Sequence, residues 1–236
     1  MKLELHLLQA EGTLEPWREM LHAEAERISQ LIAIAIPAEM HDKPVDVLVQ
    51  RLPYGVTPEL GIGGSCFRRG LVTISLDPDN ERFENSIATG EFGQLLAHEL
   101  HHSMRYDSCG YGQTLGEALV SEGLADRFAQ ELTQRRAPIW SNALQSADWS
   151  AVVDQAEAAL DRADYDHPAW FFGEGLLPKW AGYTLGYRLV EHYQRLAPQA
   201  QPHELIGACA MKLITAAWPH LKGDSHVARM ESGSGG

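Results

Sequence analysis

The chain has 236 residues, of which 44% are hydrophobic and 22% are charged, and this composition is ordinary for a soluble globular protein. The formal net charge of -13 argues against a nucleic-acid partner, because such binding needs a basic face and the sequence shows none. No stretch reaches the eighteen or more apolar residues of a membrane span, so we expect no membrane partner.

The first third of the chain predicts short strands and one long helix. Residues 2–8 alternate polar and apolar side chains as a strand does, and residues 14–34 have the periodicity of a helix. Two further strands are predicted at residues 45–52 and 70–76. We therefore expect an α+β fold.

Residues 84–106 predict a helix, because apolar side chains recur every four positions and form one stripe. Gly90 and Gly93 each cost about 1 kcal/mol relative to alanine inside a continuous helix. A start near Glu91 or Phe92 is therefore the alternative to a start at residue 84. Both alternatives place residues 98–102 inside the helix.

Residues 98–102 read His-Glu-Leu-His-His, which is an H-E-x-x-H motif. Positions i and i+4 of a helix share one face, so His98 and His102 can direct ring nitrogens at one metal ion. Glu99 lies beside them, where it can take a proton from a metal-bound water. His101 faces about 60° to 100° away from the two histidines, and we expect it behind the ligands or at the surface.

A catalytic zinc ion needs a third protein ligand, and the next predicted helix, residues 114–132, offers one. Glu122 follows His102 by twenty residues, which leaves room for a loop and a returning helix. Asp126 lies one turn later and is expected to accept a hydrogen bond from the free ring nitrogen of a ligating histidine. Glu117 is the rival ligand, but it points about 140° away from Glu122 and cannot share the site with it.

These residues resemble the gluzincin arrangement of thermolysin-like metallopeptidases, in which two histidines and a glutamate bind zinc. Four segments also resemble the DUF2268 (YjaZ-like) group of predicted zinc-dependent proteases over roughly residues 60–195. The segments are HELHHSMR, LVSEGLAD, WFFG and KWAGYTLGYRLV. The resemblance implies a zincin-like fold, with a small mixed or antiparallel sheet packed on an HExxH active-site helix and a mainly helical C-terminal lobe after it.

The expected activity is zinc-dependent hydrolysis of peptide bonds in a peptide or protein substrate. Zn²⁺ would be held by His98, His102 and Glu122, and Glu99 would activate the metal-bound water. The tetrahedral oxyanion needs a further donor, for which Tyr183 and Tyr187 are candidates one helical turn apart. We favour Tyr183, which follows a glycine near an expected helix start; the alternative is that both tyrosines only pack.

Glycines are expected where backbones approach closely. Gly123 would let its helix pack against the metal-binding helix. Zincins present an edge strand beside the metal helix, to which an extended peptide adds. Residues 70–76, or the Gly61–Gly64 segment before them, are candidates for that strand, and an ordinary glycine loop with a buried strand is the alternative.

The C-terminal part predicts helices at residues 149–163, 185–196 and 204–218. The polar stretch 135–146 is expected to separate the catalytic core from a helical lobe. We therefore expect three regions: residues 1–132 as a zincin-like catalytic core, residues 133–225 as a helical lobe that completes the active site, and residues 226–236 as a disordered tail or an artificial linker. Trp170–Gly173 would line a substrate pocket or belong to the core.

The N-terminus lacks the apolar run and cleavage site of a signal peptide, and the three cysteines are odd in number and scattered. The cysteine pattern indicates free thiols rather than disulfides. Together with the N-terminus it predicts a reducing, cytoplasmic location. Two other functions remain open: a zinc-dependent hydrolase of a non-peptide amide or ester, and a catalytically silent metal-binding regulatory protein. The sequence also leaves open the natural substrate, cleavage at chain ends or interiors, and the oligomeric state.

Overall fold

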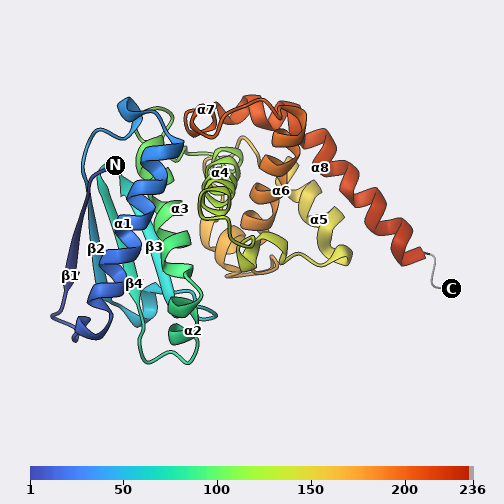
Figure 1. Cartoon of the computed structure of the whole chain (residues 1–236). Coiled ribbons are helices and arrows are strands. Elements are labelled where there is room, and N and C mark those ends of the chain that lie inside the picture. Colours follow the sequence, from blue (N-terminus) through green and yellow to red (C-terminus); the bar gives the residue numbers. More distant parts are fainter. Residues whose placement is uncertain (234–236) are drawn as a thin grey trace. The chain divides into compact units, whose positions relative to one another are not determined.

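The computed structural model describes residues 1–233, without the side chains of residue 202 and of residues 225–233 (Figure 1). The chain divides into two compact units, residues 1–110 with 128–135 and residues 111–127 with 136–236. The predicted boundary at residue 132 divides the chain by function rather than by packing, and it stays a prediction. The tail predicted at residues 226–236 also stays a prediction, and its last three residues lie outside the described part of the chain.

The first unit contains a four-stranded mixed sheet. Its strands are β1 (Leu3–Leu8), β2 (Val45–Arg51), β3 (Ile62–Arg68) and β4 (Leu71–Leu76). Their order is β1-β2-β4-β3, with parallel pairing of β1 with β2 and of β2 with β4, and antiparallel pairing of β3 with β4. The β1, β2 and β4 strands are those expected from alternating side chains, and the sheet with its helices confirms the α+β class.

The β3 strand lies at an edge of the sheet, and sequence periodicity did not predict it as a strand. Its Ile-Gly-Gly-Ser start lacks alternation, and its pairing with β4 shifts register between Ser65 and Arg68. The expectation that residues 70–76 form the edge is wrong, because β4 lies between β2 and β3. Of the two candidates for the edge strand, the glycine segment is the one that contributes to it.

Two helices pack against each other and against the sheet, α1 at β1 and α3 at β3 and β4 (Figure 1). α1 (Arg18–Ala35) follows a short 3-10 turn and buries four apolar side chains, Leu21, Ala25, Ile28 and Ile32. A Cβ added at Gly93 of α3 would lie 1.8 Å from a carboxylate oxygen of Glu24 in α1. The absence of a side chain at Gly93 therefore lets Glu24 of α1 pack directly against the backbone of α3.

The α3 helix (Glu91–Arg105) is preceded by the short helix α2 (Phe83–Ala88). Gly90 separates the two with a φ of 76°, which is a left-handed conformation that favours glycine. The later of the two predicted helix starts is therefore confirmed. The helix contains all five residues of the HELHH motif, and all five are buried.

The α4 helix (Leu115–Thr133) starts in the second unit, and its last turns belong to the first. Glu117 caps its N-terminus: one carboxylate oxygen accepts the backbone N–H of Gln113 at 2.8 Å and of Thr114 at 3.0 Å. The Thr114 hydroxyl in turn accepts the N–H of Glu117 at 3.3 Å. This reciprocal pair is a capping box, and it gives Glu117 a structural role.

The second unit is helical. Its further helices are α5 (Ser146–Glu157), α6 (Ala181–Leu196), α7 (Pro202–Ile206) and α8 (Ala210–Gly233), with a π-helical turn at Pro168–Phe172. The predicted helix at 204–218 is two helices, because the chain leaves helical geometry at Gly207. Within residues 1–233 no helix combines the length and apolarity needed to cross a membrane.

Gly123 serves a different contact from the one expected. A Cβ at Gly123 would lie 2.1 Å from the carbonyl oxygen of Gly186, so α4 crosses α6 at this point. A Cβ at Gly186 would lie 2.3 Å from the carbonyl oxygen of Leu119, so the close approach is reciprocal. The prediction that Gly123 packs against α3 is therefore wrong, and the small residue serves the core of the helical unit.

Candidate metal centre

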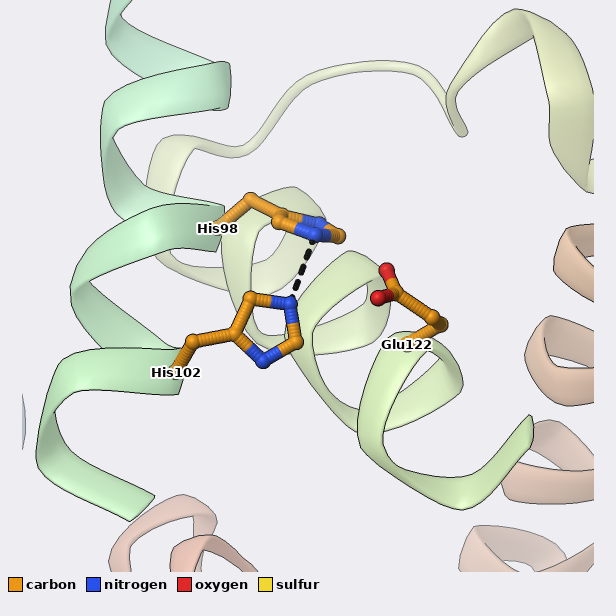
Figure 2. A group of neighbouring side chains, drawn as sticks. All are labelled: His98, His102 and Glu122. Atoms are coloured by element: carbon orange, nitrogen blue, oxygen red, sulfur yellow. Dashed lines mark hydrogen bonds between the residues drawn. The ribbon is translucent and has the colours of Figure 1, made fainter. Parts of the chain in front are cut away.

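The α3 helix brings His98 and His102 together on one face, as the i, i+4 spacing predicts. The two Nε2 atoms lie 3.0 Å apart (Figure 2). Two nitrogens bound to one tetrahedral zinc ion at 2.0–2.1 Å would lie about 3.3 Å apart. The rings are therefore close to the spacing that a shared metal ion requires.

Glu122 of α4 completes a group of three candidate ligands. Figure 2 shows its carboxylate pointing towards the two imidazoles, and one ligand atom from each of the three residues lies within 4.8 Å of the others. Exposed fractions of 5% to 7% leave all three side chains buried. Two imidazoles and one carboxylate form a ligand set used by catalytic zinc, which keeps a fourth position for water or substrate. The residues present therefore fit a divalent metal.

Glu99 lies next to His98 on α3 and is 5% exposed. A Cβ added at Gly64 of β3 would lie 2.6 Å from Glu99 Oε1 and 2.7 Å from its Cγ. The Glu99 side chain therefore rests directly on the backbone of the edge strand. The Glu99 side chain thus lies at the strand expected to receive a peptide, one residue along α3 from the candidate ligand His98.

The charge of Glu99 affects the pKa of Cys66 in β3 and of Tyr106, the residue that follows α3. Burial raises the pKa of the Cys66 thiol to about 12, and Glu99 adds to this increase. Burial, followed by Cys66 and Glu99, raises the pKa of Tyr106 above its ordinary value. The three cysteines are thiols, as expected. Cys66 and Tyr106 are therefore uncharged at neutral pH.

His101 and Asp126 are both fully buried, at 1% exposure each. The His101 ring lies 5.3 Å from the ring of Phe128, so the alternative that His101 lies at the surface is wrong. One carboxylate oxygen of Asp126 accepts a hydrogen bond from Trp140 Nε1 at 2.8 Å. The predicted hydrogen bond between Asp126 and a ligating histidine stays a prediction.

The two candidate tyrosines of α6 have different surroundings. The Tyr187 hydroxyl accepts a hydrogen bond from Arg127 at 2.9 Å, and its ring also lies beneath that guanidinium. The half-buried Tyr183 ring packs edge-on to Phe171, with the ring centres 5.0 Å apart. Trp170 and Phe171 belong to the core of the helical unit. The role predicted for Tyr183 stays a prediction.

Three residues near Glu122 were missed by the sequence analysis. The Tyr165 hydroxyl lies 3.3 Å from His167 Nδ1, and the Tyr111 ring lies 6.1 Å from the ring of His167. Burial and then the Glu122 charge raise the pKa of Tyr111 and of Tyr165. Burial lowers the pKa of His167, and Glu122 opposes that effect. No motif spacing could have found this group, because Tyr111 is far in the sequence from Tyr165 and His167.

Comparison with known proteins identifies the family. The family model described as "Predicted Zn-dependent protease (DUF2268)" matches residues 38–215, which is most of the chain. The chain belongs to the DUF2268 family. The family description fits the His98, His102 and Glu122 group, since all three residues lie within the matched range.

Two relatives of the DUF2268 chain come from Bacillus subtilis (strain 168). "Uncharacterized protein YjfC" is 29% identical over 140 residues, covering 52% of this chain and 44% of that protein. "Uncharacterized protein YjaZ" is 27% identical over 119 residues, covering 44% of this chain and 42% of that protein. The chain thus spans less than half the length of these curated relatives. No solved structure gave a significant match.

Proposed function

We propose that this chain is a zinc-dependent metallopeptidase of the gluzincin type. The observation that carries the proposal is the convergence of His98, His102 and Glu122 on one point, with the buried carboxylate of Glu99 adjacent on the same helix. The family description supports zinc and a protease. Glu99 favours catalysis over a purely structural metal site, because a structural site has no use for a buried carboxylate base.

The roles proposed for the residues follow from their chemistry. Zinc, when bound, would lower the pKa of a coordinated water to near 7 and polarise the scissile carbonyl. Glu99 takes a proton from the attacking water and passes it to the leaving amine. Asp126 orients a ligating histidine through its ring N–H. Tyr183 donates a hydrogen bond to the developing oxyanion.

The edge strand β3 is the proposed substrate strand. An extended peptide can pair with the unpaired backbone groups of an edge strand. Since Gly64 of β3 contacts Glu99, a peptide bond held along this strand would lie near the general base. An edge strand beside the candidate metal helix supports a zincin-like fold, which we propose for this chain. We also propose residues 1–132 as the catalytic core, residues 133–225 as its helical lobe, and a cytoplasmic location.

The test compares the wild type with Glu99→Gln. We expect stoichiometric zinc in both proteins, and a fall of about 10²- to 10⁴-fold in the hydrolysis of a peptide library by the variant, because general base catalysis contributes about that factor. Metal content is measured by atomic absorption and cleavage by mass spectrometry of the peptides.

Three outcomes would contradict the proposal in different ways. A variant as active as the wild type removes Glu99 from the mechanism. Hydrolysis confined to non-peptide amides or esters points to the alternative hydrolase. Zinc that raises only thermal stability, with no hydrolysis of any substrate, points to a silent regulatory protein.

A further inference from the structure

Trp140 lies in the 3-10 turn Ile139–Asn142, within the stretch that the sequence analysis treated only as a separator. Its half-buried indole donates a hydrogen bond from Nε1 to a carboxylate oxygen of Asp126 at 2.8 Å. Asp126 is 1% exposed, so this hydrogen bond forms away from bulk water. A donor to a buried carboxylate makes a strong hydrogen bond, and its removal leaves the carboxylate poorly satisfied.

The turn that carries Trp140 is fastened to α6. The Thr184 hydroxyl, which is buried, donates to the backbone carbonyl of Trp140 at 2.7 Å and accepts the N–H of Ala143 at 3.1 Å. One helical turn further along α6, the Arg188 guanidinium donates to the side-chain oxygen of Asn142 at 3.0 Å. These three hydrogen bonds hold the backbone of the turn against α6.

Ring contacts also restrict the indole itself. The Trp140 ring lies 5.5 Å from the ring of Tyr183 in α6 and 6.3 Å from the ring of Trp180, the residue that precedes α6. Aromatic pairs at these distances favour particular ring orientations. The indole N–H therefore keeps its direction towards α4.

Asp126 connects this arrangement with the candidate metal centre. It lies one turn after Glu122 on α4, and the proposed function assigns it to orienting a ligating histidine. A carboxylate can orient a partner only when its own side chain is held in place by packing and hydrogen bonds. The Trp140 indole supplies such a hydrogen bond from a turn that is itself anchored.

We propose that Trp140 is a positioning residue for the metal site. Its indole N–H holds one oxygen of the Asp126 carboxylate, so that the carboxylate keeps the direction in which it orients a ligating histidine. This inference rests on the proposed function, because it takes Asp126 as the partner of such a histidine. It deepens that function by assigning a residue that acts on the metal site through Asp126.

The test measures zinc affinity rather than activity. Trp140→Phe removes the indole N–H and keeps an aromatic ring. We expect its Kd for zinc, from competition with a chromogenic chelator, to rise about tenfold, which is the low end of the effect of removing a partner beyond the ligands.

Trp149→Phe is the matched control in the same helical unit. Trp149 is 8% exposed, and its Nε1 has no hydrogen-bond partner among the residues that the structure describes. The same change of ring size there removes no partner of the metal site, so its Kd should stay within about twofold of the wild type. Because Trp149 is the more buried of the two, an effect of lost packing alone would be at least as large in the control.

The visible spectrum of the Co²⁺-loaded proteins gives a second readout. The absorption of bound Co²⁺ depends on the geometry of its ligands. We expect the bands to shift in Trp140→Phe and to stay unchanged in Trp149→Phe. Equal spectra in the wild type and Trp140→Phe, or equal losses of zinc affinity in both variants, would overturn the inference.

A double-mutant cycle with Asp126→Ala tests the route of the effect. If Trp140 acts through Asp126, adding Trp140→Phe to Asp126→Ala lowers zinc affinity no further. Wild-type affinity in Trp140→Phe, or the same loss in both backgrounds, would contradict the positioning role. The comparison of Trp140→Phe with Trp149→Phe does not depend on the folding of Asp126→Ala.

The outcomes separate this inference from the proposed function. A wild type that binds no zinc overturns both. Weakened zinc binding in Trp140→Phe, together with a wild type that cleaves no peptide, upholds the positioning role and removes the peptidase. Peptide cleavage with full zinc affinity in Trp140→Phe removes only the positioning role.

Discussion

Gly64 determines where the Glu99 side chain can lie. Because glycine has no Cβ, the carboxylate and Cγ of Glu99 occupy the space beside the β3 backbone that a side chain would fill. The atoms in this contact are the far end of a flexible side chain, which can rotate away. A larger residue at this position would therefore displace Glu99 without requiring the sheet to move.

We expect Gly64→Ala to reduce peptide hydrolysis about 10²-fold, because general base catalysis depends on correct placement of the base. Zinc content should stay equal to that of the wild type, since the substitution leaves His98, His102 and Glu122 unchanged. Steady-state kinetics and metal analysis measure the two effects. Unchanged kcat would show that the position of Glu99 does not matter.

Gly63→Ala is the matched control at the adjacent residue. There the added Cβ would lie 2.2 Å from the carbonyl oxygen of Gly55, which is backbone and cannot rotate away. This variant should lose thermal stability, whereas Gly64→Ala should lose activity and keep its melting temperature.

At the residue scale, local spacing predicted that the three candidate ligands come together, but it did not predict the residues around them. His98 and His102 follow from helical geometry alone, and Glu122 follows from the length of a loop and a returning helix. Tyr111, Tyr165 and His167 could not be predicted, because a tertiary contact joins segments that no spacing rule connects. The buried position of His101 also required the structure, since Phe128 comes from another helix.

At the element scale, the crossing of α4 and α6 depends on two glycines. The carbonyl oxygens of Gly186 and Leu119 occupy the positions that added Cβ atoms would need. Both obstacles are backbone, so a methyl group at either glycine must push the helices apart. Such overpacking typically costs about 1–3 kcal/mol.

We expect Gly123→Ala to lower the free energy of unfolding by about 2 kcal/mol, even though alanine favours helix by up to about 1 kcal/mol. For a chain of this size the melting temperature should fall by about 4–8 °C. Gly223→Ala in α8 is the control, because no heavy atom lies within 4 Å of its added Cβ. Calorimetry should show that the control is at least as stable as the wild type. An equal fall in melting temperature in both variants would contradict the role of Gly123 in the packing of α4 on α6.

The elements themselves were predicted where a periodic pattern exists and missed where it does not. β1, β2 and β4 alternate side chains between two faces, and α3 carries an apolar stripe. β3 has two glycines directly after its first residue and contains a register shift, so it has no regular alternation. The π-helical turn at Pro168–Phe172 has no simple periodic signature, and the break at Gly207 divides one apolar pattern into two helices.

At the scale of the whole molecule, zinc should stabilise the native chain, because a ligand that binds only the folded state adds to the free energy of unfolding. At a zinc concentration of one hundred times Kd the gain is about 2.7 kcal/mol, which raises the melting temperature by about 5–10 °C. Thermal denaturation with added zinc and with a chelator measures this difference.

Variants of two glutamates in α4 distinguish the effect of metal binding on stability from the effect of the helix cap. Glu122→Gln should lose the rise with zinc, because it removes a proposed ligand. Glu117→Ala removes the cap instead, so it should lower the baseline free energy of unfolding by about 1 kcal/mol and keep the zinc-dependent rise. An equal zinc response in Glu122→Gln and the wild type would contradict the ligand role.

The edge position of β3 also affects the tendency of the protein to self-associate. An open sheet edge is a template for aggregation, and Phe67 on this strand is 86% exposed. Thr57 pairs with Ile62 at the start of the strand, and the register shift interrupts regular pairing before Arg68. Bulges and short free edges are recognised protections against edge-to-edge association. The same register shift that hid β3 from sequence periodicity is therefore of a kind that discourages pairing with a second copy of the sheet.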